Sequence, residues 1–391
     1  MKSSQRGMLA AGLMLGMVLL AAIGSLQGAL LNSVIEHFHL SSSAQGAASA
    51  AASAGSVLAL LVSFLLIGRF PKLTLLRLAL ALSAVSLALL KIAPAFGAFV
   101  ALWLLVGVGS GFIDMLLSSC MADLFTGREA TRMMCLLHTC FGLFSVICPA
   151  LYGRFLLGRL AWNDIYLCVA AAAVALTVFL TVTVRLTRES TGRALAAEER
   201  LSPRTMLGIL RQGALPGLLA AMVCHGLFLG GLNTWINRYL GVTLASDLGS
   251  LGLSFLFFGV MASRLLASFL PVDTVRYVRV GGLAAGALLL LALPFRSGTL
   301  MCISLSAQGL AFGAMIPCLL DLSCREVPES TMLATTAMGL SLYVGQIIAP
   351  PLIGALESAW SLHAGIALCG VFMLLASACC IPAPLGRKKA L

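Results

Sequence analysis

Asp114 is a carboxylate inside a long apolar stretch, where an ionisable group is costly unless it faces water or a partner. It lies about seven residues from the nearer end of that stretch, which at 1.5 Å per residue is a depth of about 10 Å. A carboxylate that has lost part of its hydration can hold a proton near neutral pH and release it elsewhere. Two interpretations stay open: Asp114 couples a process to protons, or it forms a structural ion pair with Arg264.

Two histidines, His138 and His225, also lie inside apolar stretches. An imidazole can take up or relay a proton near pH 7. We therefore expect His138 to take part in proton coupling and His225 to contact a substrate. The alternative for each is a hydrogen-bonded histidine that serves packing alone.

The other polar side chains at this depth are mostly amides, which offer hydrogen-bond donors and acceptors together and suit neutral hydroxylated or zwitterionic solutes. The alternative role for an amide is a hydrogen bond between helices, worth about 0.6 kcal/mol. A tryptophan among them suits stacking on a sugar face or anchoring at the membrane interface. The candidates for substrate contact in this group are Gln27, Asn32, Asn233, Trp235, Gln308 and Gln346.

The sequence contains no motif that would support enzyme catalysis. No set of His, Asp, Glu or Cys has metal-ligand spacing, and no nucleophile, zinc-protease or phosphate-loop motif is present. The twelve cysteines stand mostly alone in apolar runs and are interpreted as packing residues. We expect no cofactor, no metal and no enzymatic activity.

The elements that must position these residues follow from composition. Of 391 residues, 60% are apolar and 10% are charged, against about 25% charged residues in a soluble domain. Because a helix crosses a bilayer with about 20 apolar residues, the runs between charges predict twelve transmembrane helices and an all-α integral membrane protein. The tenth predicted span runs from about Gly298 to Leu320.

The net charge of +11 is explained by topology. Threading the spans from a cytoplasmic N-terminus puts 19 of the 25 Lys and Arg on the cytoplasmic side and five opposite, with Arg264 inside a span. The positive-inside rule then places both termini in the cytoplasm. We expect the chain to lie in the inner (plasma) membrane. Scattered charge of this kind does not indicate a nucleic-acid partner.

A repeat divides the chain. Residues 185–213 form the one long polar stretch, which separates a bundle of six helices at 1–184 from a second at 214–391 with a short basic tail. One offset of 202 residues pairs Gly24 with Gly226, Arg77 with Arg279, Gly107 with Gly309, Gly111 with Gly313, and Pro149 with Pro351. Six spans per half give both halves the same orientation, so the repeat is parallel, with a two-fold axis along the membrane normal.

This pattern resembles the major facilitator superfamily, whose loop signature survives in part at residues 68–72, Gly-Arg-Phe-Pro-Lys. Within it the chain is most similar to the fucose–galactose–glucose:proton symporter branch. The stretches that carry this similarity are Leu31-Asn32-Ser33-Val34, Gly111-Phe112-Ile113-Asp114, Leu137-His138 with Phe141-Gly142, and Trp235 to Leu240. Members of that branch carry one acid at the position of Ser33 and another at that of Asp114, and this chain keeps the second.

The resemblance implies a monomeric secondary transporter that moves a small organic solute, such as a sugar-like compound, by alternating access coupled to protons. Residues expected to close the inner gate are Arg69, Asp123, Arg128, Arg132 and Arg264. Asp123 can pair with Lys72 or Arg69, although a merely solvated loop is the alternative. Proton-driven efflux of amphipathic compounds is the second functional hypothesis, and a membrane sensor without transport is the third.

Overall fold

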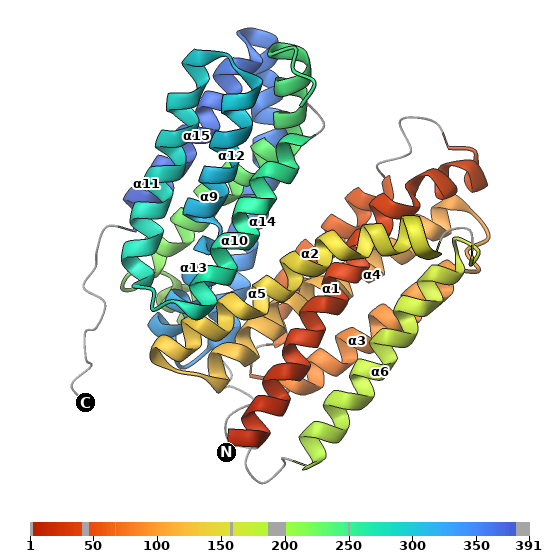
Figure 1. Ribbon diagram of the computed structural model, residues 1–391. Helices are drawn as coiled ribbons and strands as arrows, with labels where there is room; N and C mark the ends of the chain where they lie inside the picture. The colour runs from red at the N-terminus through yellow and green to blue at the C-terminus, as the bar shows by residue number, and fades with distance from the viewer. Residues whose placement is uncertain are drawn as a thin grey trace. The chain divides into compact units, whose positions relative to one another are not determined.

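The computed structural model describes residues 3–40, 47–66, 68–156, 159–186, 201–248 and 251–380, and their regular secondary structure is helical (Figure 1). Among these residues, eleven helices are long and apolar enough to cross a membrane, and residues 51–66 form a shorter apolar helix. A helix is the natural form for such runs because it satisfies every backbone hydrogen bond within the segment. The membrane-spanning, all-α prediction is confirmed.

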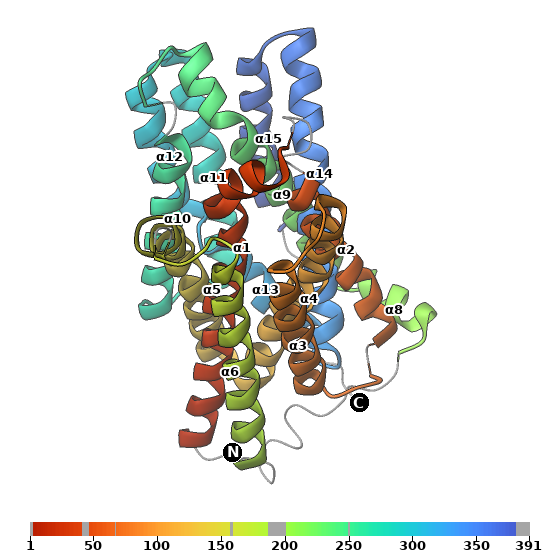
Figure 2. The ribbon, with the colours of Figure 1, turned by 90° about the vertical axis from the view of Figure 1, so that its right-hand side faces the viewer.

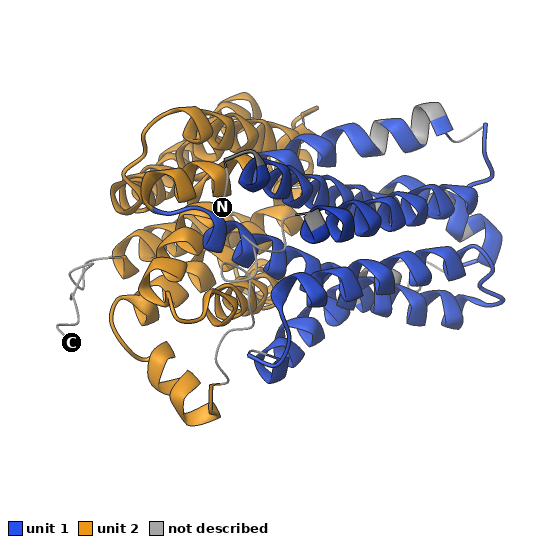
Figure 3. Cartoon of the chain, turned by 90° about the horizontal axis from the view of Figure 1, so that it is seen from below, with its two compact units in different colours: residues 1–126, 137–200 blue, residues 127–136, 201–391 orange. Residues whose placement is uncertain are grey.

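The chain divides into two compact units, coloured separately in Figure 3. Unit 1 comprises residues 1–126 and 137–200, and unit 2 comprises 127–136 and 201–391. The repeat predicts a boundary near residue 184. The units differ from this prediction at one helix, which runs from Gly127 to Ala150. Its first ten residues, 127–136, belong to unit 2, and the rest of the helix belongs to unit 1.

Unit 1 is built on six long helices, with a short π-helix after the fifth. Their bounds are α1 Ser3–Phe38, α2 Ala47–Leu66, α3 Lys72–Leu90, α4 Phe96–Leu124, α5 Gly127–Ala150, η1 Leu151–Leu156 and α6 Asp164–Leu186. Helix α4 packs against α1, α2 and α3, and α6 packs against α1 and α3 (Figures 1 and 2). Helix α4, which carries Asp114, is therefore the centre of this packing.

Unit 2 repeats that plan with one helix divided. Its elements are α8 Pro203–Leu210, α9 Leu215–Arg238, η2 Tyr239–Thr243, α10 Gly252–Phe269, α11 Thr274–Ala292, η4 Leu293–Phe295, α12 Gly298–Phe312, α13 Met315–Glu326, α14 Thr331–Ala359 and α15 Leu362–Cys379. Helix α12 packs against α10 and α11, and α9 packs against α14 and α15. The short α8 begins within the predicted polar loop, where the Ser202 side chain accepts a hydrogen bond from the backbone N–H of Thr205.

The same glycine crossing occurs once in each unit. A methyl group on Gly107 of α4 would lie 2.0 Å from the Ala52 carbonyl oxygen of α2, and one on Gly309 of α12 would lie 2.2 Å from the Leu256 carbonyl oxygen of α10. Only glycine allows backbones to approach this closely. The parallel repeat inferred from the 202-residue offset is thus visible in the packing.

The predicted tenth span, Gly298 to Leu320, corresponds to one candidate membrane span, Gly298–Glu326, that is made of two helices. Helix α12 ends at Phe312 and α13 begins at Met315, with a turn at Gly313 and Ala314 between them. Helix α13 also runs past Leu320 to Glu326, so that Asp321 lies inside a helix and is buried. Asp114 is therefore not the only carboxylate within a spanning segment.

Candidate functional site

The break between α12 and α13 is held by side chains from two neighbouring helices. Arg264 on α10 donates from Nε to the carbonyl oxygen of Gly313 (2.9 Å). The backbone N–H of Ala314 donates to the hydroxyl of Tyr277 on α11 (3.1 Å), and this hydroxyl is 2.6 Å from Ser263 Oγ. In an apolar layer, backbone groups released from a helix need such partners. The break is therefore a built feature, supported from α10 and α11.

Two residues predicted to contact substrate lie beside this break. His225 of α9 is 1% exposed, and its ring meets Phe312, the last residue of α12, edge to face with 5.4 Å between centroids. Gln308, one turn before Phe312, is fully buried and donates from Nε2 to Ser304 Oγ (2.9 Å).

Both side chains carry polar atoms that are not satisfied. Within the described part of the chain, both ring nitrogens of His225 and the Oε1 atom of Gln308 lack a hydrogen-bond partner. Leaving a buried polar atom unpaired costs about 1–3 kcal/mol, and such atoms are few in native proteins. Three unpaired polar atoms beside one helix break make His225 and Gln308 candidates for contact with a hydrogen-bonding ligand.

The remaining candidates on α9 and α14 have different surroundings. Trp235 donates from its indole nitrogen to the carbonyl oxygen of Pro350 (3.1 Å), which fixes it between α9 and α14 as a packing anchor. Asn233 is exposed on α9. Gln346 is half-buried on α14, and its backbone packs closely against Gly230.

In unit 1, the predicted proton-coupling residues lie on α4 and α5. Asp114 is half-buried on α4, one turn from Gly111, where α4 touches Ser56 and Ala59 of α2. His138 is buried on α5. The predicted pairing of Asp114 with Arg264 joins residues of different units and stays a prediction. Two candidates lie on α1: Gln27 is half-buried, and the side chain of Asn32 lies outside the described part.

The comparisons with known proteins match this architecture. The family model for the Major Facilitator Superfamily matches residues 13–332. The chain belongs to this superfamily. A TsgA protein homologue from Citrobacter koseri is 22% identical over 280 residues, which cover 69% of this chain and 68% of that protein. The resemblance to the superfamily given by the sequence is thereby confirmed.

Solved transporters of the superfamily share the fold at low identity. The human organic anion transporter MFSD10 has a TM-score of 0.76 at 16% identity, covering 96% of this chain and 99% of its own. The Escherichia coli fucose:proton symporter FucP has a TM-score of 0.73 at 13% identity, covering 95% and 97%. The proton:xylose symporter XylE has a TM-score of 0.73 at 14% identity, covering 97% and 95%.

The residues expected at the gate of this superfamily member have mixed surroundings. Asp123 at the end of α4 accepts from Lys72 Nζ at the start of α3 (2.7 Å), one of the pairings expected from the sequence. Arg69 and Arg128 are exposed. Arg132 on α5 donates from Nε to the carbonyl oxygen of Ser268 (2.7 Å), which ties α5 to the end of α10.

A second connection to α5 involves residues that the sequence analysis missed. Arg325 Nε and Nη2 donate to the two oxygens of Asp321, at 3.1 and 2.5 Å, and Thr131 Oγ1 donates to the same carboxylate (2.6 Å). Arg325 Nη2 also donates to the carbonyl oxygen of Gly127 (2.7 Å). This Asp321 network fixes the first turns of α5 to unit 2. The i,i+4 spacing of Asp321 and Arg325 is the signal that could have revealed it.

Proposed function

We propose that this superfamily member moves a small hydroxylated organic solute across the membrane by alternating access, coupled to protons. The observation that carries the proposal is the pair of buried polar residues, His225 and Gln308, with unpaired atoms beside the break in the tenth span. An imidazole and an amide together offer donors and acceptors to hydroxyl groups. FucP and XylE, which share the fold, are a fucose and a xylose symporter with protons.

The helix break supplies what a change of access requires. Helices α12 and α13 are joined by two residues, and at this junction the Gly313 carbonyl and the Ala314 N–H are held by side chains, while the Gly313 N–H and the Ala314 carbonyl keep helical partners. A solute that bonds to His225 and Gln308 touches the last turn of α12. We infer that binding there and movement at the break are linked.

Asp114 is the proposed proton carrier. It lies within the apolar span of α4 and is half-buried, so its charge is costly there while its protonated form is not. When Asp114 takes up a proton on one side of the membrane, its side chain becomes neutral. Unit 1 can then change state without moving a buried charge. His138, buried on the neighbouring part of unit 1, is the second candidate in the same role.

One reconstitution experiment tests the proposal. The purified chain in proteoliposomes is given an inward proton gradient and a panel of radiolabelled hexoses, pentoses and lipophilic cations. We expect uptake of a hydroxylated solute that Gln308→Met abolishes while the melting temperature stays the same or rises, because an apolar isostere removes an unpaired buried atom. Gln212→Met, at an exposed amide, is the matched control and should transport normally.

Asp114→Asn separates coupling from binding in the same system. We expect gradient-driven accumulation to be lost while solute exchange persists, whereas Asp247→Asn, at an exposed carboxylate, keeps both. Undiminished, pH-dependent accumulation by a folded Asp114→Asn protein refutes its coupling role. Export of lipophilic cations instead of sugar uptake supports the efflux hypothesis, and a lack of transport for every solute supports a sensor.

A further inference from the structure

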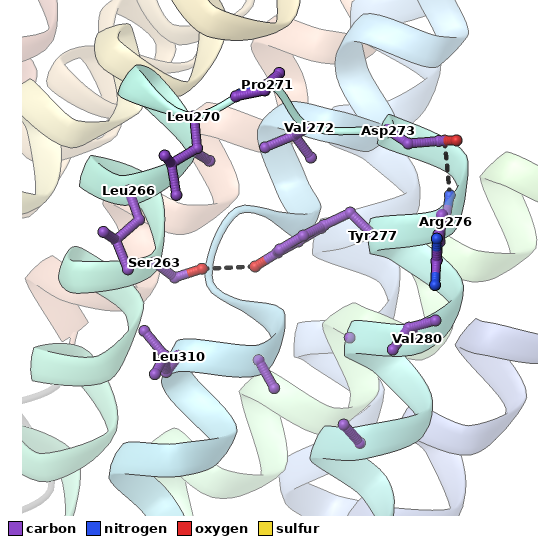
Figure 4. Close-up of a pocket in the computed structure, with 14 residues that line it drawn as sticks. Ser263, Leu266, Leu270, Pro271, Val272, Asp273, Arg276, Tyr277, Val280 and Leu310 are labelled. Atoms are coloured by element: carbon purple, nitrogen blue, oxygen red, sulfur yellow. Dashed lines mark hydrogen bonds between the residues drawn. The ribbon is translucent and has the colours of Figure 1, made fainter.

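A groove opens on the side of unit 2, between α10, α11 and the end of α12, with a volume of about 610 Å³ (Figure 4). Its walls are apolar, and four of the side chains that line it are 45–57% exposed: Leu266, Leu270, Val280 and Leu310. The volume lies in the range of small-molecule sites. In a chain that spans the membrane, a lateral apolar groove of this size faces lipid.

The floor of the groove is closed and uses its polar atoms internally. Tyr277 extends from α11 toward α10, where its hydroxyl meets Ser263 Oγ and the backbone N–H of Ala314 (Figure 4). The ring of Tyr277 therefore presents an apolar surface to the groove while its hydroxyl is fully engaged. An occupant of the groove has no hydrogen bond to gain at the floor, which favours a hydrocarbon.

The mouth of the groove carries charge. Arg276 lines it and is exposed, and in the described part of the chain its guanidinium forms no ion pair or hydrogen bond. Asp273 lies at the same mouth and caps α11 by accepting from the backbone N–H of Arg276 (3.1 Å). The next basic residue, Arg279, is engaged with the carbonyl oxygen of Cys380 (2.7 Å). Arg276 is thus the cation available to an anionic occupant.

We propose that this groove holds an acyl chain of an anionic phospholipid whose phosphate pairs with Arg276. A guanidinium binds a phosphate through two parallel hydrogen bonds, and a basic side chain at the membrane surface attracts anionic lipid. An acyl chain that moves from the bilayer into the groove stays in an apolar medium, so the move brings no hydrophobic free energy. The groove therefore selects acyl chains by shape. The headgroup preference then comes from Arg276. The connection between α10 and α11, residues 270–273, lies at the mouth and belongs to the side of the predicted topology that carries most basic residues.

The test measures bound lipid. The full chain is reconstituted in vesicles of phosphatidylglycerol and phosphatidylcholine with identical acyl chains, extracted, and examined by native mass spectrometry. We expect the wild type to retain phosphatidylglycerol about fivefold over phosphatidylcholine, the ratio that one basic residue at the surface provides. Arg276→Gln should bring the ratio close to one. Arg211→Gln, at another exposed arginine of unit 2, should leave it unchanged.

A second variant tests the groove separately from the charge. Ala284 lines the groove and is half-buried, so Ala284→Leu fills it from the lipid side and should lower retention of both lipids. A wild-type ratio of one, or an Arg276→Gln ratio equal to that of the wild type, overturns the proposal. It is also overturned if excess inorganic phosphate displaces the signal, which indicates a free-anion site, or if Ala284→Leu changes the oligomeric state and not lipid retention, which indicates a second copy.

Discussion

The Asp321 network allows a prediction in which the loss of stability depends on which partner is removed. The side chain of Asp321 is 3% exposed and that of Arg325 is 39% exposed. Removing the arginine leaves a buried carboxylate with the hydrogen bond from Thr131 as its remaining contact in the network. Removing the charge of the aspartate leaves an arginine that already reaches solvent. The two substitutions are therefore expected to differ strongly in cost.

The magnitudes follow from burial. Breaking a buried ion pair by removing one partner costs about 3–5 kcal/mol, and Arg325→Gln should fall near 3 kcal/mol because Asp321 keeps its bond from Thr131. For Asp321→Asn the lost charge-assisted hydrogen bonds are offset by hydration of the half-exposed Arg325, so we expect about 1 kcal/mol. The double variant has no orphaned buried charge and should also cost about 1 kcal/mol.

Equilibrium unfolding in mixed micelles, followed by circular dichroism, measures the four free energies of this cycle. Glu329→Gln, at an exposed carboxylate near the same helix end, is the control and should stay within about 0.5 kcal/mol of the wild type. The two single costs should exceed the cost of the double variant by about 3 kcal/mol. Additive effects, or an Asp321→Asn cost as large as that of Arg325→Gln, would refute the reasoning.

Two further predictions concern packing and topology. Gly107→Ala and Gly309→Ala should each destabilise the protein by about 1–3 kcal/mol in the same unfolding assay, because the new methyl group would lie 2.0 or 2.2 Å from a backbone oxygen, whereas Gly208→Ala, with open space around it, should be neutral or stabilising. In intact cells, Arg204→Cys should resist membrane-impermeant thiol reagents while Arg159→Cys reacts; labelling of the former from outside contradicts the proposed orientation.

The sequence predicts the helices of this fold well because a bilayer imposes a length of about 20 apolar residues on every span. The apolar run at residues 44–68 of the sequence corresponds to α2 at Ala47–Leu66. The first apolar run covers residues 8–31, and α1 continues past it to Phe38, since Glu36 and His37 can continue a helix beyond the apolar layer. Helix α8 was missed, although Ser202 followed by Pro203 is a recognisable helix start.

The site was less predictable because its geometry depends on residues distant in the sequence. Hydropathy does not distinguish Gly313 and Ala314 from the helix around them, but Pro317 has no N–H to donate to the Gly313 carbonyl, which is a local signal for the break. The groups that make the break tolerable, Arg264 and Tyr277, lie 49 and 37 residues away in the chain. His225 and Gln308 were found because polar residues in apolar runs are rare. Asp321 was assigned to a loop because the predicted span stopped one residue before it.

The two halves of the repeat differ at the residues proposed to act. At the offset of 202 residues, Arg264 and Tyr277 correspond to Val62 and Leu75, so unit 1 lacks these two supports at the equivalent positions. Its equivalent, α4, is continuous from Phe96 to Leu124. Asp114 in turn corresponds to Ile316, so unit 2 has no acid at that depth of its helix. One packing plan thus carries Asp114 in a continuous helix of unit 1 and a divided helix with buried hydrogen-bonding residues in unit 2, which is the division that the proposed coupling of proton and solute would use.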